Sequence, residues 1–174
     1  TSRGLYYSLF FLMLAGMNGV VLTGDLFNLY VFIEVASIAS YALVAFGCET
    51  EELEASFKYL VLGSLSSTII VFGVAILYGV TGTLNMAQVA QVLAAKAAMP
   101  PAALLGLGFL LSGFALKAAM VPFHAWLPDA HPSAPAPISA MLSGVLIKAI
   151  GVYLLFRLVF NVFGPSVAIA HVLM

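Results

Sequence analysis

Five long apolar stretches constrain this chain more than any other feature of its sequence. Each is close to the roughly 20 residues that a helix needs to cross the hydrocarbon core of a bilayer. We place them at Leu5–Leu22, Leu26–Phe46, Ala55–Val80, Ala102–Val121 and Pro137–Phe160. Because 63% of the 174 residues are hydrophobic and only 7% are charged, the sequence predicts an all-α polytopic membrane protein with five transmembrane helices.

Composition and motifs exclude several other classes of function. The formal net charge is -1 and the six Lys and Arg are dispersed, which argues against a nucleic-acid partner. The sequence contains no glycine-rich phosphate loop, no cysteine cluster and no nucleophile motif. We therefore expect no cofactor, no metal and no catalytic residue within this chain.

Short connections and chain ends indicate how the stretches are organised. Only Thr23–Asp25 separates the first two stretches, so they should form an antiparallel pair. Asn85 is suited to cap a short amphipathic helix that is too short to span. The chain begins at Thr1, and another apolar run opens after Gly164. We expect residues 1–174 to be one transmembrane domain and a fragment of a longer subunit.

Three ionisable residues, Glu34, Lys117 and Lys148, lie inside these apolar stretches. A charged side chain at the centre of a membrane helix costs about 2.5 to 3.5 kcal/mol on insertion scales. Charges at that depth commonly mark a path for ions or protons. Movement of protons or ions is therefore the leading functional hypothesis for this chain.

Glu34 lies near the middle of the second stretch, with Ser37 and Ser40 close to it on the same helix. A carboxyl group in hydrocarbon favours its neutral form, and a nearby ammonium group restores its charge. A carboxyl group poised between these two states is suited to a proton relay. The alternative is a structural glutamate that locks two helices together by hydrogen bonding.

Lys117 precedes a predicted break in the fourth stretch. Pro122 follows it by about one turn, and a proline removes a backbone donor and clashes with the preceding turn. Broken membrane helices are tolerated where they line a buried or watery cavity. The alternative is a lysine that snorkels to the membrane surface, which would apply if Val121 marked that surface.

Lys148 lies about midway between Pro137 and Phe160, where snorkelling to either surface is hardest. We expect it to carry protons along the membrane interior. The structural alternative is a permanent salt bridge, for which Glu34 is the available partner at mid-span.

The segment after the break, PFHAWLPDAHPSAPAP, mixes apolar and titratable residues and predicts a short half-helix with a structured return. Histidine is the side chain most suited to exchange protons near neutral pH. His124 and His131 are therefore candidates to pass protons between bulk water and the interior. Asp129 with His131 gives only a weak metal signal. Lys58 is either a snorkelling anchor or part of a proton-uptake route toward Glu34.

Several long motifs resemble one known family. They are GDLFNLYVFIEVASIASYALVAF, KYLVLGSLSSTIIVFGVAILYGVTGTLNMA, LKAAMVPFHAWLPDAHPSAPAPISAML and LIKAIGVYLLFR, in this order along the chain. They resemble the antiporter-like membrane subunits shared by respiratory complex I, Mrp-type cation/proton antiporters and membrane-bound hydrogenases. The motifs are most similar to the D-type subunit of Mrp antiporters and its hydrogenase counterpart.

The resemblance implies a fold and a set of roles. Family members consist of two inverted five-helix repeats, each with one broken helix, and this chain resembles the first repeat with its break near Pro122. Glu34 would be the glutamate of the fifth helix, Lys117 the lysine of the broken seventh and Lys148 the lysine of the eighth.

The family context also implies partners and a location. We expect a multi-pass subunit of a prokaryotic inner membrane that translocates protons or sodium ions, in contact with lipid and with other membrane subunits. We expect it to be a non-catalytic, ion-translocating subunit of an NADH:quinone oxidoreductase-like, hydrogenase or Mrp complex. Two alternatives stay open: a quinone-binding subunit of a membrane oxidoreductase, with its site around Trp126, and an inert membrane scaffold.

Overall fold

The computed structural model describes residues 2–164, with side chains from residue 3, and every named element in that part of the chain is helical. The apolar run predicted after Gly164 lies outside the described residues. In chain order the helices are α1 (Ser2–Leu22), α2 (Leu26–Val44), α3 (Thr50–Thr81), α4 (Met86–Ala94), α5 (Pro101–Lys117), α6 (Leu127–Ser133), α7 (Ala136–Met141), η1 (Leu142–Val152), α8 (Tyr153–Phe156) and η2 (Arg157–Phe163).

The last four segments form one continuous rod, Ala136–Phe163, in which η1 and η2 have the wider turns of a π-helix. The rod and helices α1, α2 and α3 are each long and apolar enough to cross a membrane. Helix α5 is apolar but has only 17 residues. The all-helical membrane prediction is therefore confirmed in kind, whereas the count of five crossing helices stays a prediction.

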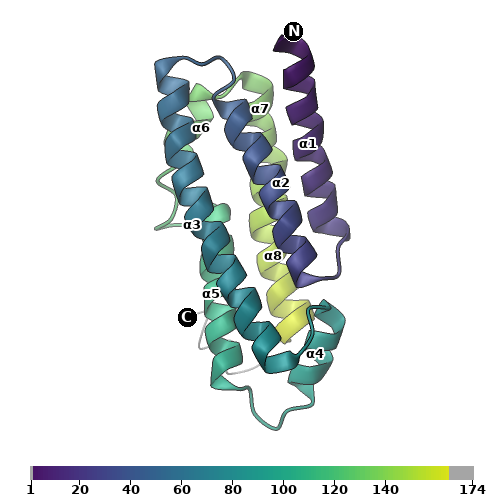
Figure 1. The fold of residues 1–174 in the computed structure, drawn as a ribbon. Coiled ribbons are helices and arrows are strands. Elements are labelled where there is room, and N and C mark those ends of the chain that lie inside the picture. The colour runs from purple at the N-terminus through teal and green to yellow at the C-terminus, as the bar shows by residue number, and fades with distance from the viewer. Residues whose placement is uncertain (1, 165–174) are drawn as a thin grey trace.

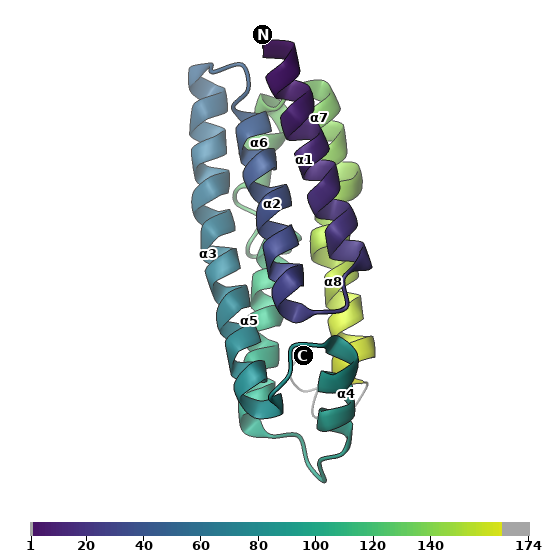
Figure 2. The same ribbon diagram turned by 45° about the vertical axis from the view of Figure 1, so that its right-hand side comes forward.

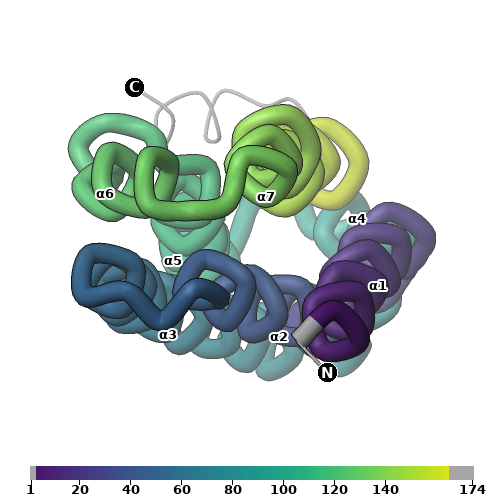
Figure 3. The backbone as a smooth tube through the Cα atoms, turned by 90° about the horizontal axis from the view of Figure 1, so that it is seen from above, coloured from purple at the N-terminus to yellow at the C-terminus, as the bar shows by residue number. Residues whose placement is uncertain are grey.

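The helices form two layers. Seen from above, α3, α2 and α1 lie in one row, and α5 with α6 and the α7 rod lie in the other (Figure 3). Helix α3 packs along α5, and α1 packs along α2 (Figure 2). Glycines permit the closest of these approaches: a Cβ on Gly73 of α3 would lie 3.0 Å from the carbonyl oxygen of Gly106 of α5. Close backbone contact of this kind is how membrane helices gain packing energy without a hydrophobic driving force.

Polar side chains end the helices where the sequence predicts turns. Asp25 caps α2 by accepting hydrogen bonds of 2.9 Å from the backbone N–H groups of Phe27 and Asn28. Asn85 caps α4 in the same way, as predicted. The two capping residues also pair with each other through a short antiparallel bridge. These caps satisfy backbone donors that would otherwise be left without partners.

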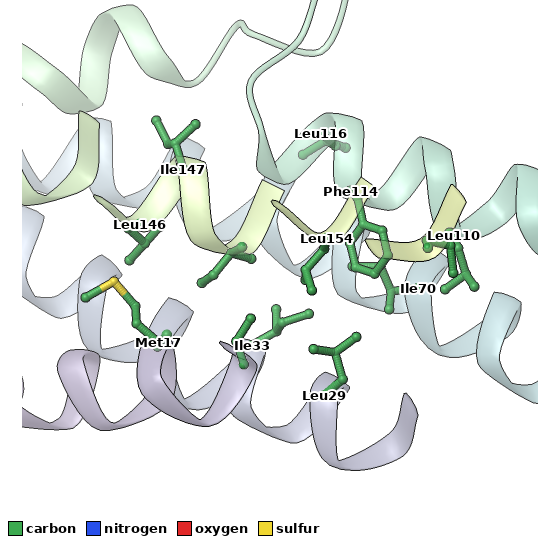
Figure 4. Packing of buried hydrophobic residues seen from close by; sticks show 14 of the residues in the cluster. Met17, Leu29, Ile33, Ile70, Leu110, Phe114, Leu116, Leu146, Ile147 and Leu154 are labelled. Atoms are coloured by element: carbon green, nitrogen blue, oxygen red, sulfur yellow. The ribbon is translucent and has the colours of Figure 1, made fainter. Parts of the chain in front are cut away.

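The apolar core fills the space between the layers. Figure 4 shows Met17 and Ile33, from the first layer, pointing toward Leu146 and Leu154 of the rod. All four side chains are buried, with exposed fractions of 4% or less. This core fixes the positions of the helices that carry the charged residues.

Candidate functional site

Helix α5 ends at Lys117, and the chain resumes helical structure only at α6. The gap lies about halfway along the bundle, and α6 lies beyond it toward the opposite end (Figure 1). The end is closed by a hydrogen bond of 2.9 Å from Met120 N–H to the carbonyl of Ala115, with Ala119 at a left-handed φ of 51°. This is the usual closure of a helix end, although a non-glycine residue in that conformation costs about 1–2 kcal/mol. The predicted break after Lys117 is confirmed.

Lys117 is buried in the interior of the bundle. Its side chain is 5% exposed, and its Nζ donates hydrogen bonds to Ser37 Oγ at 2.9 Å and to Tyr41 OH at 3.3 Å. Lys117 is also the basic residue in the last turn of α5, where a positive charge is favoured. The alternative of a lysine snorkelling to the surface does not describe this side chain.

Glu34 forms an ion pair with Lys117, with 3.9 Å between Glu34 Oε1 and Lys117 Nζ. The same carboxylate oxygen accepts a hydrogen bond from Ser67 Oγ of α3. The glutamate side chain is 28% exposed, whereas the lysine is almost fully enclosed. Each charge therefore has its own hydroxyl partners, and the two attract each other across a gap longer than a hydrogen bond.

Tyr41 reaches Lys117 because α3 leaves room for its hydroxyl group. A Cβ on Gly63 would overlap the Tyr41 hydroxyl oxygen, so only glycine fits at that position without displacement. Tyr41 is 5% exposed. The absence of a side chain at Gly63 thus sets the position of one of the lysine's two hydrogen-bond acceptors.

Lys148 occupies a different environment from Lys117. It is exposed on η1, and its Nζ donates to the carbonyl of Ser143 on the same helix. Among the described residues, no carboxylate lies within ion-pair distance of it, because Glu34 pairs with Lys117. The expected alternative of a Glu34–Lys148 salt bridge is wrong for this structure, and a role for Lys148 as a proton carrier stays a prediction.

A second polar group joins α3 to α6 at the end of the bundle where α3 begins. Lys58 Nζ lies 2.9 Å from Asp129 Oδ2 and 2.8 Å from Glu54 Oε1. Both members of the Lys58–Asp129 pair are about half exposed, at 45% and 44%. They line a hollow of about 250 Å³ together with Glu51, Pro132 and Ser133. Lys58 is thus fixed in an ion pair at a water-accessible hollow.

The two histidines lie apart from the Glu34–Lys117 pair. His124 is exposed in the turns between α5 and α6. His131 belongs to α6, the predicted half-helix, and its Nδ1 is 2.8 Å from Ser139 Oγ. Asp129 and His131 therefore have separate partners. Over residues 2–164, no group of three or more His, Cys, Asp or Glu is arranged to hold a metal ion.

Trp126 is buried against the end of α5. It is 2% exposed, its ring stacks on Tyr59 with centroids 4.3 Å apart and planes 9° apart, and its Nε1–H donates to the carbonyl of Leu116 at 3.2 Å. Because the Trp126 ring is buried, it does not form an exposed wall against which a quinone could bind. A separate apolar hollow of about 640 Å³, lined by Met120, Phe123 and Phe156 among others, lies between α5 and the rod.

Sequence reasoning missed two residues of the site, Tyr41 and Ser67. Tyr41 follows Glu34 by seven residues, which is two helical turns on the same face. Ser67 lies on a face of α3 where small residues recur at helical spacing, among them Ser56 and Gly63. Both signals were visible in the sequence, although neither indicates which helix the face packs against.

Comparisons with known proteins identify the relatives of this chain. Residues 23–174 match the transmembrane family described as NADH:quinone oxidoreductase/Mrp antiporter. Over 160 residues the chain is 42% identical to the N-type subunit of the NADH-quinone oxidoreductase of Desulforudis audaxviator, covering 92% of this chain and 31% of that protein. It is 40% identical over 172 residues to the D-type subunit of the Na(+)/H(+) antiporter of Bacillus subtilis, covering 99% of this chain and 34% of that protein.

Comparison with solved structures identifies the same kind of protein. The chain matches a chain of the membrane-bound sulfane sulfur reductase, an archaeal respiratory membrane complex, with a TM-score of 0.84 and 40% identity, covering 94% of this chain and 33% of the other. It matches a chain of the Mrp complex from Dietzia sp. DQ12-45-1b with a TM-score of 0.80 and 39% identity, covering 89% and 29%. The chain spans about a third of the length of these relatives. The resemblance inferred from the sequence motifs is therefore confirmed: this chain belongs to the NADH:quinone oxidoreductase/Mrp antiporter transmembrane family.

Proposed function

We propose that this chain forms part of a path for protons, or for protons in exchange for sodium ions, in an antiporter-like subunit of a redox-driven or Mrp-type complex. Its partners are the other membrane subunits of that complex and the surrounding lipid. The observation that carries the proposal is the buried Glu34–Lys117 ion pair at the end of a broken helix, surrounded by hydroxyl groups. Burying such a pair is costly, and a purely apolar contact would serve packing better.

The pair is suited to act as a switch. At 3.9 Å the carboxylate is near enough to stabilise the ammonium but does not bind it directly. Ser37 and Tyr41 hold the ammonium while Ser67 holds the carboxylate. A small movement of Glu34 toward or away from Lys117 therefore changes how tightly the lysine holds its proton, without leaving either group unbonded.

Two further steps extend the proposed path within this chain, which holds at most one half of a transmembrane path. Lys148 receives the proton released from Lys117, and its exposure on η1 leaves it accessible from outside the described bundle. Uptake from water takes place at the end of the bundle that carries Lys58 and Asp129. His131 lies on α6 with Asp129, and His124 lies in the turns between α5 and α6.

Replacement of Lys117 by alanine tests the proposal. In the full-length subunit within its assembled complex, Lys117→Ala should reduce the ion gradient formed in membrane vesicles to the level of vesicles without the complex. Lys96→Ala removes an exposed lysine after α4 and should leave the gradient unchanged. An unchanged gradient in the Lys117→Ala complex would eliminate the proposed role. Recording pH-sensitive and sodium-sensitive dyes in parallel identifies the ion.

A further inference from the structure

Two contacts, one polar and one aromatic, join the same two segments of the chain. Lys58 and Tyr59 are consecutive residues of α3, and Trp126 and Asp129 lie three residues apart at the start of α6. The outer contact is the Lys58–Asp129 ion pair at 2.9 Å. The inner contact is the Tyr59–Trp126 ring stack with 4.3 Å between centroids. The two contacts therefore form or break together if α6 moves relative to α3.

The boundary between water and the protein interior lies between these two contacts. The side chains of Lys58 and Asp129 are 45% and 44% exposed and line the polar hollow. Tyr59 and Trp126 are 4% and 2% exposed. Tyr59 directly follows Lys58 in the chain, and Trp126 precedes Asp129 by three residues. The buried rings are therefore close in the chain to two residues that line the hollow.

Behind the stack lies the polar group around Lys117. Tyr59 OH accepts a hydrogen bond of 3.0 Å from Ser40 Oγ, and its ring meets Tyr41 edge-on with 4.5 Å between centroids. Tyr41 OH in turn accepts from Lys117. A chain of contacts therefore leads from the Tyr59–Trp126 stack through Tyr41 to Lys117.

Trp126 also contacts the end of α5 directly. Its Nε1–H donates to the carbonyl of Leu116, the residue before Lys117. If the Trp126 ring left Tyr59, this carbonyl would lose its side-chain donor at the broken helix end. Trp126 therefore links the ring stack to the end of α5 that carries Lys117.

We propose that the Tyr59–Trp126 stack is a gate between the polar hollow and Lys117, and that the Lys58–Asp129 ion pair is the latch that holds it shut. This inference rests on the proposed function, since a gate matters only if protons or ions reach Lys117. The latch suits its task because an exposed ion pair is weak and screened by salt, so it opens at little cost. The gate suits its task because stacked buried rings exclude water.

Access of a thiol reagent to position 40 tests the gate. Ser40 is fully buried and bonded to Tyr59 OH, so a cysteine there reports on water that passes the stack. In the full-length subunit within its complex, Ser40→Cys is combined with Cys48→Ser, because Cys48 is exposed. A charged, water-soluble methanethiosulfonate reagent is added, and modification of the position-40 peptide is followed by mass spectrometry. Modification should be slow while the gate is intact.

Opening the latch or the gate should speed this modification. Asp129→Asn should raise the rate about two- to fivefold, which is the range expected for loss of an exposed ion pair. Trp126→Ala should raise it further, because the rate follows the population of the open form. Trp126→Phe keeps a ring for stacking and should leave the rate slow. If Trp126→Ala fails to assemble, the surface substitution Asp129→Asn carries the test.

Ser66→Cys in the same background is the matched control. Ser66 is equally buried but lies two turns beyond Tyr59 on α3, bonded to the carbonyl of Gly113 of α5. Its modification should stay slow in every variant. The gate is overturned if Asp129→Asn leaves position 40 as slow as before, or if positions 40 and 66 accelerate equally. Because the assay measures access and not transport, a failure of the Lys117→Ala test would leave its outcome interpretable.

Discussion

Among the residues that the structure describes, two ion pairs link different helices. The pair with the shorter distance is the more exposed of the two, and the pair with the longer distance is the more enclosed. Lys58 and Asp129 are 2.9 Å apart and about half exposed. Lys117 and Glu34 are 3.9 Å apart, and the lysine is 5% exposed. Water and salt screen the shorter pair strongly and the longer pair little. The longer contact therefore keeps more of its electrostatic interaction than the shorter one does.

The two pairs also differ in what supports them. The surface pair depends on direct contact, with Glu54 as a second carboxylate on the same lysine. The buried pair depends on hydroxyl groups from two other positions of α2 and one of α3, and on a glycine that leaves space for one of them. A charge held at membrane depth requires this supporting network because no water is available to replace a missing partner.

After loss of Lys117 itself, the largest effect should come from removing the carboxylate that pairs with it. Glu34→Gln keeps the size of the side chain and removes the charge that opposes Lys117, so ion transport should fall at least about tenfold, corresponding to about 1.4 kcal/mol or more of lost stabilisation. The measurement is the proton gradient formed by the assembled complex in vesicles. Glu49→Gln, at an exposed residue that makes no side-chain cap of α3, should have no effect. Equal transport in both variants would place the buried pair outside the ion path.

A smaller effect should come from filling the space under Tyr41. Gly63→Ala forces the tyrosine hydroxyl away from its position beside Lys117, and overpacking of this kind costs about 1–3 kcal/mol. The thermal midpoint of the complex should fall. Gly79→Ala in the same helix meets nothing within 4 Å and should be neutral or slightly stabilising, since alanine is the better helix former. A midpoint lowered equally by both substitutions would indicate a general intolerance of α3 to alanine.

The two charged residues of the buried pair could be predicted from the sequence. Glu34 and Lys117 stand out because charges inside apolar stretches are costly, and Pro122 predicted the end of α5 because proline cannot continue a helix. Asn85 predicted the start of α4 in the same local way. Each of these features depends on residues close together in the chain.

The sequence did not predict how the helices meet. Lys148 looked buried by its position in its stretch, yet it lies on an exposed face of η1, because position along a helix does not determine which face a neighbour covers. Ser67 and Tyr59 approach the site from α3, far from Glu34 and Trp126 in the chain. Such contacts depend on the angle and register of packed helices, which a single sequence does not encode in a visible pattern.

The smallest effect on stability should come from the surface pair, and salt distinguishes it from the buried pair. Asp129→Asn should lower the thermal midpoint only slightly, because both partners are half exposed. At about 1 M salt, where the Debye length is near 3 Å, that difference should vanish. The midpoint difference caused by Glu34→Gln should persist, since bulk ions do not screen a lysine enclosed by α2 and α5.

Measuring both midpoints at low and high salt therefore tests the comparison itself. Lys58→Met serves as the matched control for the surface pair, because it removes the other charge of the same contact and should show the same disappearance at high salt. If instead Asp129→Asn lowered the midpoint as much as Glu34→Gln at both salt concentrations, the short exposed contact would be holding the fold. Breaking the Lys58–Asp129 pair would then be costly. The Tyr59–Trp126 gate could not open during each ion-transfer cycle by loss of that pair alone.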